Sequence, residues 1–130
     1  ALSAAVYPDR QTAARLGQDW PGWVEAGLLD VLCPMNYEHD AARFAARLDE
    51  IAAACPAGRV AVVAGIGTGA SSPGPDALDA ARQIAACRKR GLGGFAFFHL
   101  DDLLLGSILP SLRLNESARV SSGGMKETEP

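Results

Sequence analysis

The amino-acid sequence predicts an α/β fold in which parallel strands alternate with helices. Two observations carry this prediction. Four short apolar runs show no clean alternation of polar and apolar residues, which is typical of strands buried on both faces. Helical patterns lie between these runs, and one strand–helix unit spans about 30 residues, the usual size of a parallel crossover. We therefore expect four parallel strands, each followed by a helix.

The four expected strands are rich in β-branched, aromatic or small apolar residues. They are Leu2–Tyr7, Val31–Tyr37, Val60–Ile66 and Phe95–Leu100. Pro34 lies inside the second run. A proline within a strand favours an irregular backbone, which is common near binding sites.

The helices are predicted from capping residues and from apolar periodicity. A first helix can begin after Asp19, because an aspartate caps helix N-termini well. Ala41–Ala54 places apolar residues at spacings of four and three along one face. Pro75–Arg90 repeats this pattern, with basic residues at its end that suit the helix dipole. Asp101–Leu112 is expected as a last short helix that stops near Pro110.

Residues 1–114 are expected to form one half of a (β/α)8 barrel, and residues 115–130 a disordered tail with little to bury. Eight strand–helix units close a barrel of about 250 residues, so four units make half of one. A half-barrel exposes its inner face and needs a partner half, in the same longer chain or in a homodimer. The alternative is a small open, doubly wound sheet. Because the chain starts at Ala1 without a signal region, we expect a segment of a longer protein.

Composition excludes several functional classes. The formal net charge of -3 does not support a basic nucleic-acid surface. No apolar run approaches the roughly 18 residues of a membrane span. The three cysteines are widely spaced and lack a CxxC pair, so neither a disulfide framework nor a zinc site is expected. No cofactor or metal is implied.

Candidate site residues follow the expected strands, because ligands of parallel α/β folds meet the carboxyl ends of the strands. Hydroxyls, amides, aromatics and carboxylates collect at this rim, which suits a polyhydroxylated ligand. Asp9 and His99 are the candidate catalytic groups, as a carboxylate and a proton-transfer residue. The candidate substrate contacts are Tyr7, Met35, Asn36, Tyr37 and Asp101.

Each candidate also has a purely structural interpretation. Asp9 and Asp101 can equally cap the helices that follow them. Asn36 can be a turn residue, and a single histidine such as His99 is more often structural than catalytic. Sugar rings stack on aromatic side chains, but the two tryptophans lie on the expected outer helix layer, where core packing is favoured.

Four segments of the chain resemble the C-terminal half of glycosyl hydrolase-like family 10 domains, which are bacterial (β/α)-barrel proteins. These segments are LSAAVYPD, GQDWPGWVEAGLLDVLCPMNY, VAGIG and GFAFFHL. The resemblance covers about residues 1–112, and its most specific part is Gly17–Tyr37. It implies that the four strands are the fifth to eighth of a barrel that hydrolyses glycosidic bonds in a polysaccharide. It also makes export or attachment to the cell envelope an expectation.

The resemblance implies an incomplete catalytic centre in this segment. Glycoside hydrolysis normally uses two carboxylates that flank the scissile bond. In related barrel glycosidases at least one of them comes from the fourth strand, which would be absent here. The segment is then expected to supply substrate-binding rim residues.

Two further functions stay open. One is a non-catalytic carbohydrate-binding or structural remnant of such a barrel. The other is a phosphate-binding barrel enzyme, because the loop GIGTGASS resembles a glycine-rich phosphate cradle. Asp101 and Asp102 at the start of the last helix would repel an anion, so the phosphate interpretation ranks lower.

Overall fold

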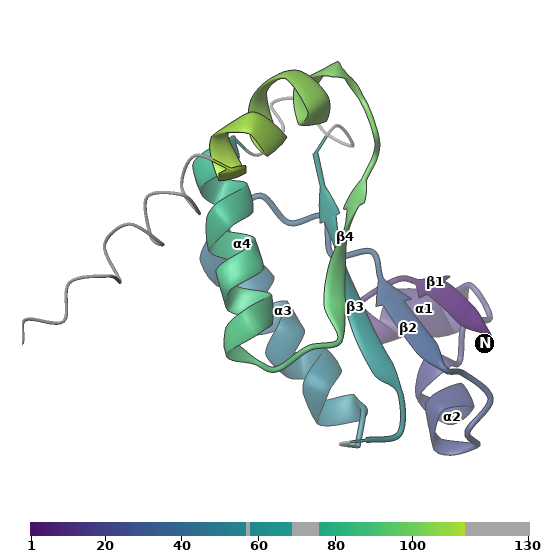
Figure 1. Cartoon of the computed structure of the whole chain (residues 1–130). Coiled ribbons are helices and arrows are strands. Elements are labelled where there is room, and N and C mark those ends of the chain that lie inside the picture. Colours follow the sequence, from purple (N-terminus) through teal and green to yellow (C-terminus); the bar gives the residue numbers. More distant parts are fainter. Residues whose placement is uncertain (57, 69–75, 114–130) are drawn as a thin grey trace, which may run out of the picture.

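The chain forms a four-stranded parallel sheet with helices between the strands (Figure 1). The computed structural model describes residues 1–56, 58–68 and 76–113. The strands are β1 (Ser3–Val6), β2 (Val31–Pro34), β3 (Ala61–Gly67) and β4 (Gly94–Phe98). This arrangement confirms the predicted α/β class. The tail predicted over 115–130 lies outside the described residues.

Helices α1 to α4 all begin directly after an aspartate. They are α1 (Arg10–Arg15), α2 (Trp20–Glu25), α3 (Ala41–Ala54) and α4 (Ala77–Lys89). In each case the carboxylate accepts a hydrogen bond from a backbone N–H in the first turn, which satisfies a donor that has no partner within the helix. The prediction for α3 is confirmed at both ends. The observed α4 is shorter at both ends than the predicted helix over Pro75–Arg90, because Asp76 is its N-cap and Arg90 its C-cap.

The last helix differs from its prediction. Residues 102–113 are helical, and their central part is the π-helical segment η1 (Leu104–Ile108). The helix continues through Pro110, where we expected it to stop. A proline cannot donate to the preceding turn, and the wider π-helical turn lies directly before it. The local change in winding therefore accommodates a residue that would break a regular α-helix.

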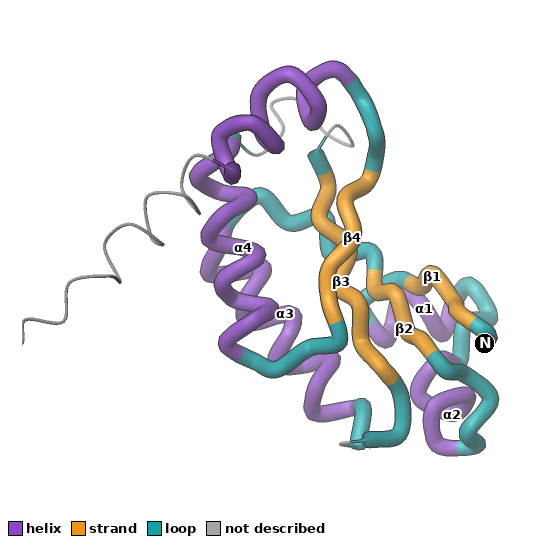
Figure 2. Tube along the Cα trace, in the orientation of Figure 1, coloured by secondary structure: helices purple, strands orange, loops and turns teal. Residues whose placement is uncertain are grey.

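The strands are ordered β1-β2-β3-β4, so each strand pairs with the one that precedes it in the chain (Figure 2). Right-handed crossovers between strands in this order place the helices on one face of the sheet. The buried core agrees with this: alternate strand residues such as Val6, Leu32 and Ile66 form one cluster with Trp20 of α2 and Phe44 of α3. Helices α3 and α4 lie side by side along β3 and β4 (Figures 1 and 2).

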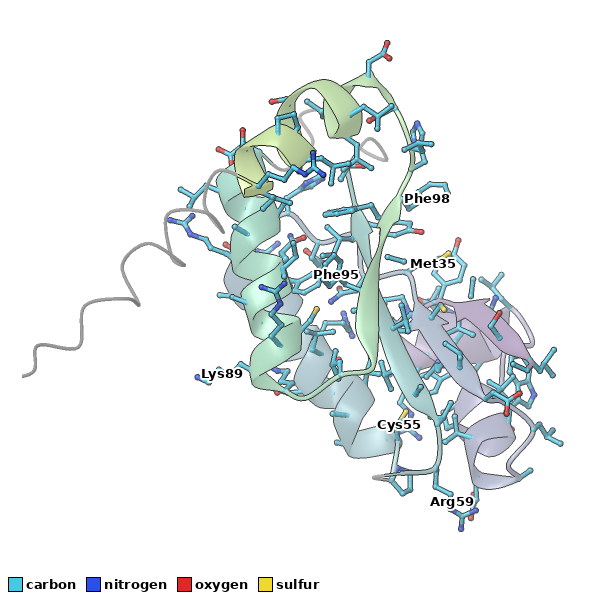
Figure 3. All side chains as sticks on the ribbon, viewed as in Figure 1. Met35, Cys55, Arg59, Lys89, Phe95 and Phe98 are labelled. Carbon is cyan, nitrogen blue, oxygen red and sulfur yellow. The ribbon has the colours of Figure 1, made fainter. Side chains whose placement is uncertain are left out.

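The opposite face of the sheet carries no helix from the described residues. Strand alternation places small or apolar side chains there, and most of them are exposed or half-buried. They include Ser3, Ala5, Val31, Cys33, Ala61, Val63, Gly65, Gly67, Ala96 and Phe98. Figure 3 shows this alternation on β4, where Phe95 points toward α4 and Phe98 points away from it.

The second strand ends earlier than predicted. It stops at Pro34 instead of Tyr37, and its pairing with β3 is limited to Val31 with Ala61 and Leu32 with Val62. Beyond Pro34 the backbone curls, because the N–H of Asn36 donates to the carbonyl of Pro34 at 2.9 Å. Such a bond across two residues is a γ-turn. The segment that follows is therefore a loop at the carboxyl end of the sheet.

Candidate functional site

An aromatic pair lies at the carboxyl ends of β2 and β4. The rings of Tyr37 and Phe98 are stacked, with centroids 5.2 Å apart and planes inclined by 11°. Phe98 is 49% exposed, whereas Tyr37 is half-buried. Burial raises the pKa of the Tyr37 hydroxyl, so this phenol stays protonated at neutral pH. The pair therefore offers a partly exposed aromatic surface with one hydroxyl.

Two glycines of β3 make room for the Tyr37 ring. A Cβ atom placed on Gly67 would lie 2.9 Å from the Tyr37 Cβ and 3.0 Å from its Cγ. A Cβ atom on Gly65 would lie 3.1 Å from the Tyr37 Cε1 and 3.0 Å from the Pro34 carbonyl oxygen. The separation of 2.9 Å is too short for a real Cβ atom, and those of 3.0 and 3.1 Å are tighter than most real Cβ contacts. The ring of Tyr37 therefore lies directly on the backbone of β3, on the face without helices.

Phe98 was not among the predicted site residues. It lies inside an apolar run, and the run alone does not show which side chains face the helices. The strand period provides the missing signal: Phe98 pairs in register with Gly67, so the two share one face of the sheet. An aromatic residue opposite a glycine on that face marks a position where a further ring can pack.

Asn36 and Met35, two of the predicted substrate contacts, differ in burial. Asn36 is only 1% exposed, and its side-chain amide donates to the Phe44 carbonyl at 3.1 Å. Met35 is half-buried, and its backbone N–H donates to the carbonyl of Val6. Asn36 is therefore turned toward the core and supports the loop. Its neighbour Tyr37 contributes the aromatic ring that forms part of the surface.

Asp9 adopts the position of a helix cap. Its carboxylate accepts from the backbone N–H of Thr12 at 2.7 Å, and its second oxygen lies 3.6 Å from the Arg47 guanidinium. The hydrogen bonds from Thr12, helped by the charge of Arg47, hold the pKa of Asp9 below its ordinary value. The carboxylate is therefore ionised at neutral pH, and its two oxygens are engaged by Thr12 and Arg47. It is not suited to act as a proton-donating acid.

His99 and Asp101 lie together beyond β4. The imidazole Nε2 of His99 is 3.7 Å from a carboxylate oxygen of Asp101, and the His99 ring meets Phe98 edge to face. The other oxygen of Asp101 accepts from the backbone N–H of Leu104 at 2.8 Å, so this residue also caps the last helix. His99 itself is exposed and can contact a ligand.

Thr68 is a further residue that the sequence pattern did not identify. It is buried; its backbone N–H donates to the Phe98 carbonyl at 2.7 Å, and its hydroxyl donates to the His99 carbonyl at 3.0 Å. These two bonds fasten the end of β4 to β3. The threonine thereby holds the backbone of Phe98 and His99 against the end of β3.

Tyr7 follows β1 and is 43% exposed, which fits its predicted place at the rim. Its backbone N–H donates to the Gln18 side-chain carbonyl at 2.9 Å. The tryptophans are in the core, as predicted: Trp20 is fully buried and Trp23 packs half-buried against the same cluster. Neither belongs to the aromatic surface formed by Tyr37 and Phe98.

Other kinds of site are not found in the part of the chain that the structure describes. No three histidine, cysteine, aspartate or glutamate side chains gather there in a way that could hold a metal ion. None of its helices has the length and apolar character needed to cross a bilayer. A shallow hollow lined by Gly27, Asp30, Gly58 and Arg59 lies at the amino ends of β2 and β3, away from the rim.

Fold and rim together define an α/β protein whose consecutive parallel strands end in an aromatic and polar surface. Comparison of the chain with family models, with curated proteins and with solved structures finds no match.

Proposed function

We propose that the chain is half of a (β/α)8 barrel of glycosidase type, and that it supplies rim residues for binding a polysaccharide. The strand order supports the barrel: a doubly wound sheet reverses its strand order at a switch point, whereas these strands run consecutively. The mainly apolar character of the face without helices suits the packed interior of a barrel. The resemblance to glycosyl hydrolase-like family 10 domains points to the same architecture.

The partner half is either further strand–helix units of a longer chain or a second copy. The molar mass of the purified 130-residue chain, measured by light scattering after size exclusion, tests this part of the proposal. We expect a dimer, or else a monomer that binds a hydrophobic dye through its open sheet face. A monomeric chain that unfolds cooperatively and binds no dye would contradict a missing half.

The single observation that carries the binding function is the stack of Tyr37 on Phe98. Sugar rings present apolar C–H faces that pack on aromatic rings, and their hydroxyls need hydrogen-bonding groups nearby. Phe98 offers an exposed ring, and His99 lies beside it. Polar side chains next to a flat aromatic surface are the combination that a carbohydrate requires.

A non-catalytic role is the second candidate, and the state of the carboxylates favours it. Asp9 and Asp101 each accept a backbone hydrogen bond at a helix start. Asp9 has a lowered pKa, so it does not supply the protonated acid of a glycosidase pair. In a complete barrel, that acid would come from the partner half. For the phosphate alternative, residues 69–72 of the glycine-rich loop GIGTGASS lie outside the described residues.

Glycan binding is tested by replacing Phe98 with alanine. An array of envelope and matrix oligosaccharides first identifies a ligand, which is then titrated by calorimetry. We expect Phe98→Ala to bind about tenfold more weakly, because the exposed ring of the stack is lost. Leu28→Ala is the matched control, since Leu28 is similarly exposed but precedes β2 at the other end of the sheet. Equal affinity of Phe98→Ala and the original chain would contradict the proposed platform.

A further inference from the structure

Two buried amide side chains hold the loop that carries Tyr37. Asn36 precedes Tyr37 and donates to the Phe44 carbonyl in α3. On the other side, the carbonyl of Glu38 accepts a hydrogen bond of 2.7 Å from the Gln83 side chain in α4. Tyr37 is therefore held on both sides by residues adjacent to it in the chain. The two anchoring helices, α3 and α4, are packed against each other.

Each of these amides also carries a cost in stability. Asn36 and Gln83 are both 1% exposed, and each uses its N–H group on a backbone carbonyl. The side-chain oxygens of both residues have no hydrogen-bond partner among the described residues. A buried oxygen without a donor lowers stability, and an apolar side chain of similar size would avoid this penalty. The hydrogen bonds that the two side chains do make, one each, both hold the loop that carries Tyr37.

We propose that Asn36 and Gln83 are positioning residues that place the Tyr37 ring on β3 and against Phe98. The proposal rests on the proposed function only in taking Tyr37 as part of the ligand surface. A ring on a loop loses conformational freedom when it binds a ligand, and a ring that is already fixed loses less. Asn36 and Gln83 would supply this preorganisation from the buried side. Phe98 and His99 complete the surface on the exposed side.

The first test replaces Gln83 with methionine, which keeps the length of the side chain and removes its donor. Contacts of the Tyr37 ring with the α-protons of Gly65 and Gly67 are followed by nuclear Overhauser effects in the 130-residue chain. We expect these signals to be lost in Gln83→Met, while the chain still unfolds in one cooperative transition. The matched control is Gln11→Met, at an exposed position of α1, which should change neither measurement.

A second variant keeps the proposal testable if Gln83→Met does not fold. Asn36→Leu keeps the size of the side chain and removes the bond to Phe44 from the other side of Tyr37. It is expected to lose the same contacts with Gly65 and Gly67. If either variant unfolds cooperatively and retains these contacts, the proposed positioning role is wrong.

Glycan titration separates this proposal from the proposed function. Lost Tyr37 contacts together with weaker glycan binding would support both proposals. Lost contacts with unchanged binding would support the positioning of Tyr37 and would contradict its place in the ligand surface. The nuclear Overhauser measurement therefore decides the positioning role by itself, because it needs no ligand.

Discussion

Replacing Trp20 with alanine is expected to lower the free energy of unfolding by about 3–5 kcal/mol. Trp20 is completely buried at the start of α2 and packs in the same cluster as Val6 and Leu32. Truncation removes a large apolar surface and leaves a cavity that the surrounding strands can close only in part. Urea unfolding followed by far-ultraviolet circular dichroism measures the change.

Two variants make this prediction specific. Trp20→Phe keeps most of the apolar volume and should be much less destabilising. The indole N–H of Trp20 has no partner among the described residues, so its loss removes no hydrogen bond. Trp23→Ala on the same helix is also expected to be milder, since Trp23 is only half-buried. Equal losses for Trp20→Ala and Trp23→Ala would contradict the assigned difference in burial.

Placing a methyl group on Gly67 is the second substitution with a large expected effect. In Gly67→Ala the new Cβ would lie 2.9 Å from the Tyr37 Cβ, so the tyrosine must move away from β3. We expect a loss of about 1–3 kcal/mol in the free energy of unfolding, as is usual for overpacking. The contacts between the Tyr37 and Phe98 rings should weaken at the same time.

The control for this change is Gly106→Ala, because a Cβ at Gly106 meets no atom within 4 Å. Adding a methyl group there tests the general effect of removing a glycine from the chain. An unchanged unfolding midpoint for Gly67→Ala, with the ring contacts intact, would show that Tyr37 does not lie on β3. Thermal unfolding and nuclear Overhauser spectra provide the two measurements.

Local patterns in the sequence were sufficient for most of the fold. The periodicity of Ala41–Ala54 places α3 at its observed bounds, because this signal acts within one helix. The apolar runs located all four strands to within a few residues. The general tendency of proline to end a helix did not predict that the last helix continues through Pro110. This continuation depends on the π-helical turn that precedes the proline.

Less of the candidate site could be predicted from the sequence. Tyr7 and Tyr37 were correctly placed at the carboxyl ends of strands, because the topology of parallel sheets determines that edge. The inward orientation of Asn36 depends on α3, and the bond from Gln83 connects positions 45 residues apart. Such contacts between distant segments leave no periodic signal. Phe98 was missed for a related reason, since its role depends on Gly67 in the neighbouring strand.

The consecutive strand order has a consequence for how the chain folds. Each strand pairs with the strand made just before it, so every pairing closes a loop of similar and moderate length. The entropy of loop closure then does not increase as the sheet grows, and units can be added in the order of synthesis. Tyr37 emerges with the unit that contains β2, and Phe98 emerges later, with β4. The aromatic stack is therefore completed only when β4 joins the sheet.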